Sequence, residues 1–280
     1  QIDLTSLSIQ IPQIIRTEAK GYINSPLDDA QRNGNLMLSL ETYNMRSFEK
    51  MMENVSLPAG IQLVGNAKIN GYQLSTDVLL NIKNRKNAYL TAEYNQQTER
   101  YMADLQIDSL NIHHFLPNDS LYEVNASAHV EGKGFDSFSP QTSIVFTGNI
   151  SQLMYGNHAF SNITIDADMH QSKAKALLNI QDQDINLSSI FTASLHRQGV
   201  KANLSAKLNN FNFQTFSLTD ESLKSALQLN ATMSTDLKNN HKMNASLTNI
   251  QLITPKKTFK TKDLHAGGEI TFDSVRCYVN

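Results

Sequence analysis

The sequence predicts an all-β fold, an elongated meander of antiparallel strands with few short helices. Three observations predict it: apolar and polar residues alternate over long runs, turn-forming segments separate those runs, and helical patterns are short and rare. Because successive side chains on a strand point to opposite faces, a run of period two has one dry face and one wet face. The 280 residues suffice for two ordinary domains or for one elongated β-structure.

Three segments follow one another along the chain. We expect residues 1–56 to form N-terminal strands and a short helix, because residues 44–54 (NMRSFEKMMEN) place apolar side chains at helical spacing. Residues 57–264 are expected to form a repetitive β-meander, and residues 265–280 to form the start of a further, truncated strand. The clearest alternating runs span residues 61–69, 101–107, 163–169 and 200–208.

Short turn-prone segments join these runs, which indicates antiparallel hairpins in sequence order. They lie at residues 70–71, 84–87, 155–157 and 238–240, and the glycines at 132–134 and 267–268 are also interpreted as hairpin turns. Two more short helices are expected at residues 111–117 and 217–223, where Thr219 is a candidate cap for a single turn.

A weak internal repeat relates residues 109–135 to residues 207–240. Each segment runs from a strand through a short aromatic-bearing turn to a (D/E)SL step, and then to a strand that opens on Asn-Ala followed by Ser or Thr. Repeated units that cannot close a core alone point to an extended architecture in which units stack.

The charges argue against two classes of partner. Lys and Arg number 24 and Asp and Glu number 26, with both signs interspersed. The chain therefore lacks the basic surface expected of a nucleic-acid binder and the polybasic patch that docks proteins on anionic membranes. The single cysteine, Cys277, cannot form an internal disulfide, and we interpret it as a small apolar residue of the last strand.

No catalytic or metal-ligating constellation emerges, so we expect no enzyme activity, no metal and no cofactor. The adjacent His113 and His114 would point to opposite faces of a strand, and no nucleophile elbow, zinc or phosphate-binding motif is present. Asp166 and Asp168 are interpreted as solvated charges on the polar side of a strand. Residues 182–184, with two further carboxylates, are interpreted as a solvated turn.

The order of strands, the (D/E)SL step and the phrases FTGNIS (residues 146–151) and YGNHAFSNI (residues 155–163) resemble the TamB branch of the AsmA-like envelope protein family. The Asn-rich composition is similar to that of members from the Bacteroides group, and the likeness covers roughly residues 57–264. The resemblance implies a curved half-pipe, or β-taco, with an apolar inner groove. It also implies a periplasmic, non-enzymatic scaffold of the cell envelope that conducts phospholipid between the inner and outer membranes, aids outer-membrane protein assembly, or does both.

The resemblance further implies the partners of such a protein, of which this chain would be a middle, β-rich segment. Phospholipid acyl chains would lie in the groove. A missing N-terminal anchor would reach the inner membrane, and a missing C-terminal region would dock on an outer-membrane barrel partner. No nucleic acid is expected.

Apolar residues of the alternating runs are our candidates for the lining of a lipid groove, since each buried methylene contributes about 0.8 kcal/mol. They are Ile163, Ile165, Met169, Leu204, Leu208, Leu227 and Leu229. Two alternatives stay open. The same residues would also pack against each other in a closed sandwich. The chain would otherwise be a cell-surface β-module for adhesion or carbohydrate binding, although the absence of Trp leaves no obvious platform for sugars.

Overall fold

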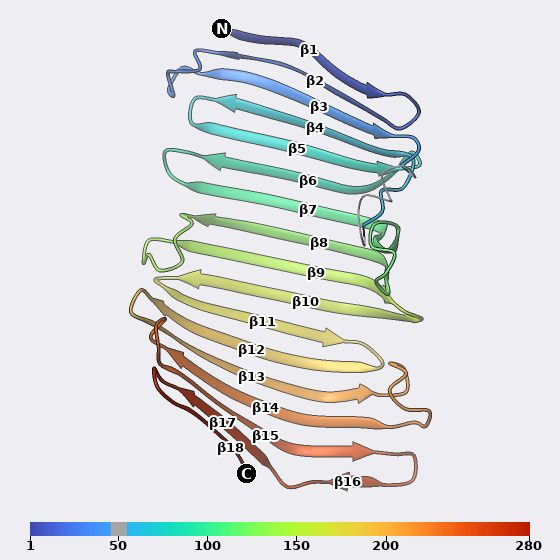
Figure 1. The fold of residues 1–280 in the computed structure, drawn as a ribbon, viewed down its shortest axis with the longest axis vertical. Helices are drawn as coiled ribbons and strands as arrows, with labels where there is room; N and C mark the ends of the chain where they lie inside the picture. The colour runs from blue at the N-terminus through green and yellow to red at the C-terminus, as the bar shows by residue number, and fades with distance from the viewer. Residues whose placement is uncertain (46–54) are drawn as a thin grey trace. The chain divides into compact units, whose positions relative to one another are not determined.

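The computed structural model describes residues 1–45 and 55–280 and confirms the predicted all-β meander. Its strands form one antiparallel sheet (Figure 1). They are β1 (Ile2–Ile11), β2 (Ile15–Asn24), β3 (Asn33–Thr42), β4 (Ile61–Asn70), β5 (Gln73–Ile82), β6 (Arg85–Asn95), β7 (Arg100–Asn111), β8 (Leu121–Lys133), β9 (Ser143–Tyr155), β10 (His158–His170), β11 (Lys173–Gln181), β12 (Ile185–His196), β13 (Gly199–Asn212), β14 (Lys224–Thr235), β15 (His241–Ile253), β16 (Thr258–Lys260), β17 (Leu264–Ile270) and β18 (Val275–Val279). A single 3-10 turn, η1 (Ile112–His114), is the one helical element of the described chain. In that part of the chain, no helix has the length and apolar character needed to cross a membrane.

The chain divides into two units, which are described separately. The N-terminal unit comprises Gln1–Lys133 and Ile150–Ala159, and the C-terminal unit comprises Gly134–Asn149 and Phe160–Asn280. Strands β1 to β8 belong to the first unit and β11 to β18 to the second, whereas β9 and β10 contribute residues to both. Within each unit the strands pair with their neighbours in sequence, except that β15 pairs with both β16 and β17.

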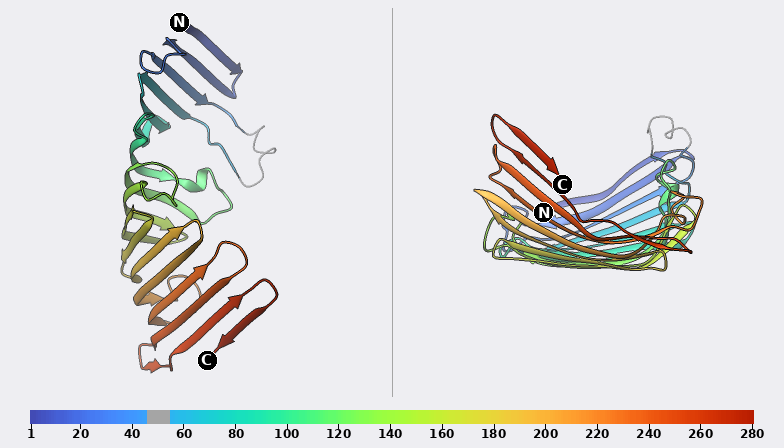
Figure 2. Two further views of the ribbon diagram at one scale, coloured as in Figure 1. Left: turned by 90° about the vertical axis from the view of Figure 1, so that its left-hand side faces the viewer. Right: turned by 90° about the horizontal axis from the view of Figure 1, so that it is seen from below.

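The strands of each unit lie in a single layer (Figure 2). The chain exposes 17,907 Å² to solvent, well above the roughly 12,000 Å² expected of a compact monomer of this mass. In the described residues, all strands belong to the one sheet, so the closed sandwich of two sheets is not found. Apolar side chains on one face of each layer are therefore left without a second layer to cover them.

Loops fold back over the sheet at two places and form small local cores. In the N-terminal unit, Ile61, Ile82 and Leu110 are buried, and Phe115, which follows η1, packs against them together with neighbouring half-buried apolar residues. In the C-terminal unit, Phe216 from the β13–β14 loop stacks on rings of two strands, Phe160 on β10 and Phe211 on β13, with centroids 5.5 and 4.6 Å away.

The two segments related by the sequence pattern share a further irregularity. Between β7 and β8 the register shifts between Ile107 and Leu110, and between β13 and β14 it shifts between Leu208 and Phe211. In both hairpins the shift comes just before the aromatic-bearing loop. An extra residue on one strand bends it locally, which suits a chain that is about to leave the sheet and fold back.

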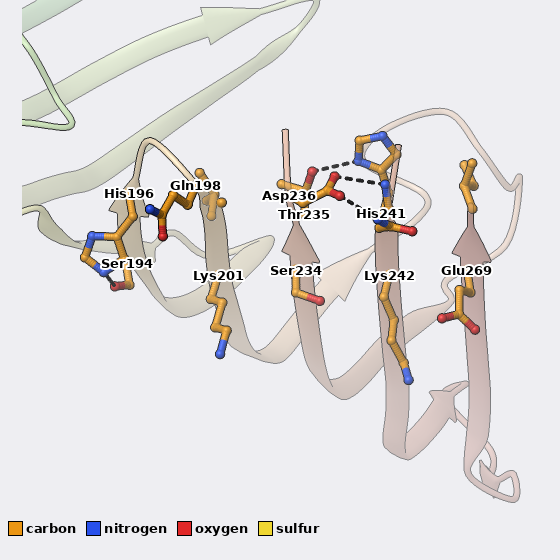
Figure 3. Close-up of a pocket in the computed structure, with 14 residues that line it drawn as sticks. Ser194, His196, Gln198, Lys201, Ser234, Thr235, Asp236, His241, Lys242 and Glu269 are labelled. Carbon is orange, nitrogen blue, oxygen red and sulfur yellow. Dashed lines mark hydrogen bonds between the residues drawn. The ribbon is translucent and has the colours of Figure 1, made fainter. Parts of the chain in front are cut away.

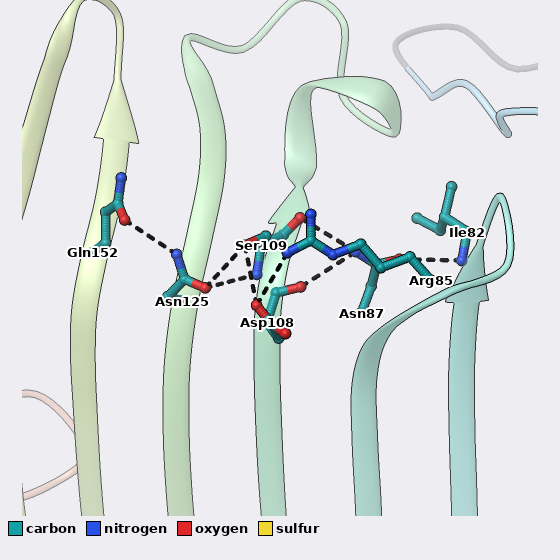
Figure 4. A network of polar contacts seen from close by, with 7 residues as sticks. All are labelled: Ile82, Arg85, Asn87, Asp108, Ser109, Asn125 and Gln152. Atoms are coloured by element: carbon teal, nitrogen blue, oxygen red, sulfur yellow. Dashed lines mark hydrogen bonds and ion pairs between the residues drawn. The ribbon is translucent and has the colours of Figure 1, made fainter.

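Polar side chains, of which that of Asn87 is buried, support the ends of β5 to β9 in the N-terminal unit (Figure 4). The Asn87 side chain is buried; it accepts the Ile82 N–H at 3.1 Å and donates to the Ser109 carbonyl at 3.3 Å. Asn125 accepts the Ser109 N–H at 2.7 Å and donates to the Gln152 side chain at 3.3 Å. These amides satisfy backbone groups that the sheet ladder leaves open near the register shift.

The expected helices are corrected in part. Most of residues 44–54 lies outside the described residues. The segment 111–117 contains η1, whereas residues 217–223 form no helix and are a turn followed by irregular chain. Thr219 does not cap a helix, because its hydroxyl donates to the Glu221 carbonyl at 2.9 Å, and a capping hydroxyl would accept a backbone N–H.

Gly267 and Gly268 are not a hairpin turn, contrary to the sequence-based interpretation; both lie within β17. Their role is steric. A Cβ atom on Gly267 would lie 2.4 Å from the ring of Tyr278, so the missing side chain makes room for that ring. Aromatic residues on a neighbouring strand commonly cover strand glycines in this way.

Candidate functional site

One face of the C-terminal unit is apolar from β10 to β18, which follows from the register. Directly paired residues of antiparallel strands project from the same face. A row of such pairs runs from Ile163 through Ile180, Leu187 and Leu208 to Leu227. A second row on the same face joins Met169, Ala174, Ala193, Ala202, Met233, Met243, Gly268 and Cys277. We call this surface the apolar face.

The structure places all seven predicted lining residues on the apolar face. Ile163, Ile165 and Met169 come from β10, Leu204 and Leu208 from β13, and Leu227 and Leu229 from β14. The register brings several of them together, since Leu208 pairs with Leu227 and the partner of Leu229 is Ala206, two residues before Leu208. Ile163 and Met169 are buried and the other five are half-buried. Their role in binding lipid remains a prediction.

An accessible part of the apolar face was missed by the sequence reasoning. Phe191, Met233 and Met243 lie on it and expose 40%, 44% and 57% of their surface. Phe191 pairs with Leu204, one of the predicted residues, and Met233 pairs with Met243. These residues are found from the pairing between strands, which places them on the same face as the predicted residues. The alternation within a single strand does not show which residue of the next strand pairs with it.

The N-terminal unit carries a similar apolar face, and that face is hollowed near the start of the chain. A hollow of about 310 Å³ lies between β1 and β5, where Leu4, Leu36 and Ile69 stand around Gly21 and Gly34. Because Gly21 and Gly34 have no side chains, the sheet surface is lower at these two positions than around them. Further along the same face, burial raises the pKa of Tyr101 above its ordinary value.

Asp182 and Asp184 are not the solvated charges that the sequence suggested. Asp184 is buried and accepts a hydrogen bond from the Asn212 side chain at 2.7 Å. Asp182 accepts the Ser161 N–H at 3.1 Å and the Asp184 N–H at 2.9 Å. These carboxylates tie the β11–β12 turn to neighbouring strands. In contrast, Asp166 and Asp168 are exposed on the polar side of β10, as predicted.

Neither a protein-family model nor a curated protein nor a solved structure matches this chain. The apolar face of the C-terminal unit and the hollow in the N-terminal unit are therefore described from their geometry alone. Such a surface can bind long apolar molecules by burying their apolar area. The hydrophobic contribution is non-directional, so it does not hold the molecule at one position.

Proposed function

We propose that this chain is a periplasmic segment of a TamB-like, non-enzymatic scaffold that carries phospholipid acyl chains along its apolar face. One observation carries the proposal: large apolar side chains, among them Phe191, Met233 and Met243, line one face of a single-layer sheet and are open to solvent. Soluble monomers rarely expose continuous apolar surface of this kind, and where they do, it usually marks a binding site.

Acyl chains suit this face better than a compact ligand does. One apolar row crosses the strands from β10 to β14 and the other from β10 to β18, so the surface is long and offers repeated, similar contacts. Each methylene moved from water contributes about 0.8 kcal/mol, and neighbouring positions are nearly equivalent. A chain could therefore move from row to row at low cost, which conduction of lipid requires.

The remaining parts of the proposal follow the family resemblance. An inner-membrane anchor and a docking region for an outer-membrane barrel would be supplied by other parts of a longer protein. Help in outer-membrane protein assembly would use the same surface, because the strands of an unassembled barrel also present an apolar face.

Site-specific photo-crosslinking tests the proposal. The photoreactive residue p-benzoylphenylalanine replaces Phe191 in one variant and Ile190 in a matched control. The two positions are adjacent on β12, point to opposite faces and expose 40% and 47% of their surface. Both variants are produced in a bacterial periplasm, irradiated and analysed by intact-mass spectrometry.

We expect a phospholipid adduct at position 191 and none, or at least tenfold less, at position 190. Equal yields at both positions, or no lipid adduct at 191, would refute lipid binding by the apolar face. Crosslinks from 191 to outer-membrane proteins in place of lipid would favour the assembly role.

A further inference from the structure

A row of basic side chains crosses the face opposite the apolar face in the C-terminal unit. Residues paired in register across the strands project from one face, so the row can be followed from pair to pair. It consists of Lys173, Ser194, Lys201, Ser234, Lys242, Glu269 and Arg276. Figure 3 shows Lys201, Ser234, Lys242 and Glu269 on neighbouring strands of this face. We call this surface the basic row.

The four cations of the basic row are exposed and carry no partner within the described chain. Lys173, Lys201, Lys242 and Arg276 make no ion pair or side-chain hydrogen bond with any described residue. Only one carboxylate, that of Glu269, stands in the row with them. Four like charges in one line repel each other, so an anionic ligand would be attracted to all four at once.

The surface around the basic row is hollowed. Two hollows, of about 550 and 480 Å³, lie on this part of the sheet, and Ser194 and Lys201 line both. Hydroxyl and amide side chains, such as those of Thr192 and Asn203, share the walls with two carboxylates outside the row, those of Asp168 and Asp236. Neither hollow is lined by Phe or Tyr. The hollows therefore offer charge and hydrogen bonds, and their aromatic groups are the imidazole rings of His170, His196 and His241.

The cations repeat at a regular interval. Lys173 lies on β11, Lys201 on β13, Lys242 on β15 and Arg276 on β18, and β17 alone separates β15 from β18 in the sheet. Successive cations are thus two strands apart, which corresponds to about 10 Å. A polysaccharide that carries one acidic group on every second sugar has anions at a similar interval and hydroxyls between them.

We propose that the basic row binds a linear anionic polysaccharide of this kind. The acidic groups pair with the four cations, and the sugar hydroxyls bond to Ser194, Ser234 and the side chains beside them. Single-stranded nucleic acid fits less well, because its bases bind mainly by stacking on aromatic side chains, and no Phe or Tyr lines the hollows. A hollowed face also suits a chain better than the flat surface of a membrane.

Binding of hyaluronan, which has one carboxylate in each disaccharide, tests the proposal. The full 280-residue chain is compared with Lys201→Gln/Lys242→Gln and with the control Lys20→Gln/Lys68→Gln. The control removes two exposed lysines from the N-terminal unit and gives the same net charge. Circular dichroism establishes that both variants fold. Dextran, a single-stranded oligothymidylate and vesicles of phosphatidylcholine with phosphatidylglycerol serve as competing ligands.

We expect the chain and the control variant to bind hyaluronan, more weakly as salt rises, since exposed charges are screened. The Lys201→Gln/Lys242→Gln variant should lose at least about tenfold in affinity, and dextran should not compete. Absence of hyaluronan binding, or an equal loss in the control, would overturn the proposal. So would lysine-dependent binding of the oligonucleotide or the vesicles at equal or higher affinity. Lipid crosslinking at Phe191 is a separate readout, and neither result decides the other.

Discussion

The phenol of Tyr278 on β18 donates a hydrogen bond to the side-chain oxygen of Asn244 on β15, at 2.9 Å. The bond passes over Gly267 of β17, the strand that lies between them. Tyr278 thus holds the last strand of the sheet to a strand that it does not pair with.

Replacement of Gly267 by Ala should release β18 from the sheet. The new Cβ would meet the Tyr278 ring at 2.4 Å and force the ring away, which removes the bond to Asn244. Hydrogen exchange of the β18 amides should accelerate at least tenfold. The matched control is Gly268→Ala, whose Cβ would find ordinary contacts at 3.7 Å. Equal protection in both variants would contradict the steric role of Gly267.

Replacement of Asn87 by Leu should destabilise the ends of β5 to β7. The change leaves the buried Ile82 N–H and the Ser109 carbonyl without their side-chain partner, at a cost of about 1–3 kcal/mol. Amide exchange of Ile82 and its neighbours measures the loss. Asn203→Ala, on an exposed site of β13, is the control and should leave exchange unchanged.

Replacement of Phe216 by Ala should loosen the β13–β14 loop. Each stacked ring pair is worth about 0.5–1.5 kcal/mol beyond burial, and Phe216 takes part in two, with Phe160 and Phe211. Limited proteolysis within residues 213–223 should become several times faster. Phe272→Ala removes a ring that is 87% exposed and should have no effect on cleavage. Unchanged proteolysis in the Phe216 variant would show that the loop is held by other contacts.

The β14–β15 turn should respond to acid through Asp236. Its carboxylate accepts the N–H groups of Lys238, Asn239 and Asn240 and the side chain of Asn240, which holds its pKa far below the ordinary value. Because the pKa is lower in the folded state, the ionised carboxylate stabilises the turn fully above the unfolded-state pKa, near 4. This stabilisation is lost as the pH falls toward the folded-state pKa. Carboxyl-carbon NMR should show Asp236 still ionised at pH 3. An ordinary titration near pH 4 would contradict these contacts, and Asp236→Asn should abolish the acid response of the turn amides.

Alternation predicts the strands well because one side chain in two must face the dry side of a half-buried sheet. It therefore also placed the seven residues from Ile163 to Leu229 on one face. It did not distinguish an open sheet from a sandwich, because both bury the same half of each strand. Only the structure shows the one layer.

Features that depend on pairing between strands were beyond the reach of the sequence pattern. The basic row is one: Lys173 and Arg276 are far apart in the chain, and the nearly neutral total charge hides their common line. The exposure of Phe191 is another, since it depends on which loops fold back over the sheet. Gly267 was misinterpreted because a glycine pair marks a turn as readily as it marks room for a neighbouring ring.

The one-layer sheet has a consequence for how the chain folds and comes apart. Each strand contacts mainly the strands beside it, and these are its neighbours in sequence. Stability is then close to a sum over adjacent hairpins, as in a one-dimensional chain of coupled units. Folding can begin at any hairpin and spread in both directions. Heating should melt the sheet in stages from its edges, so a single melting temperature will not describe it.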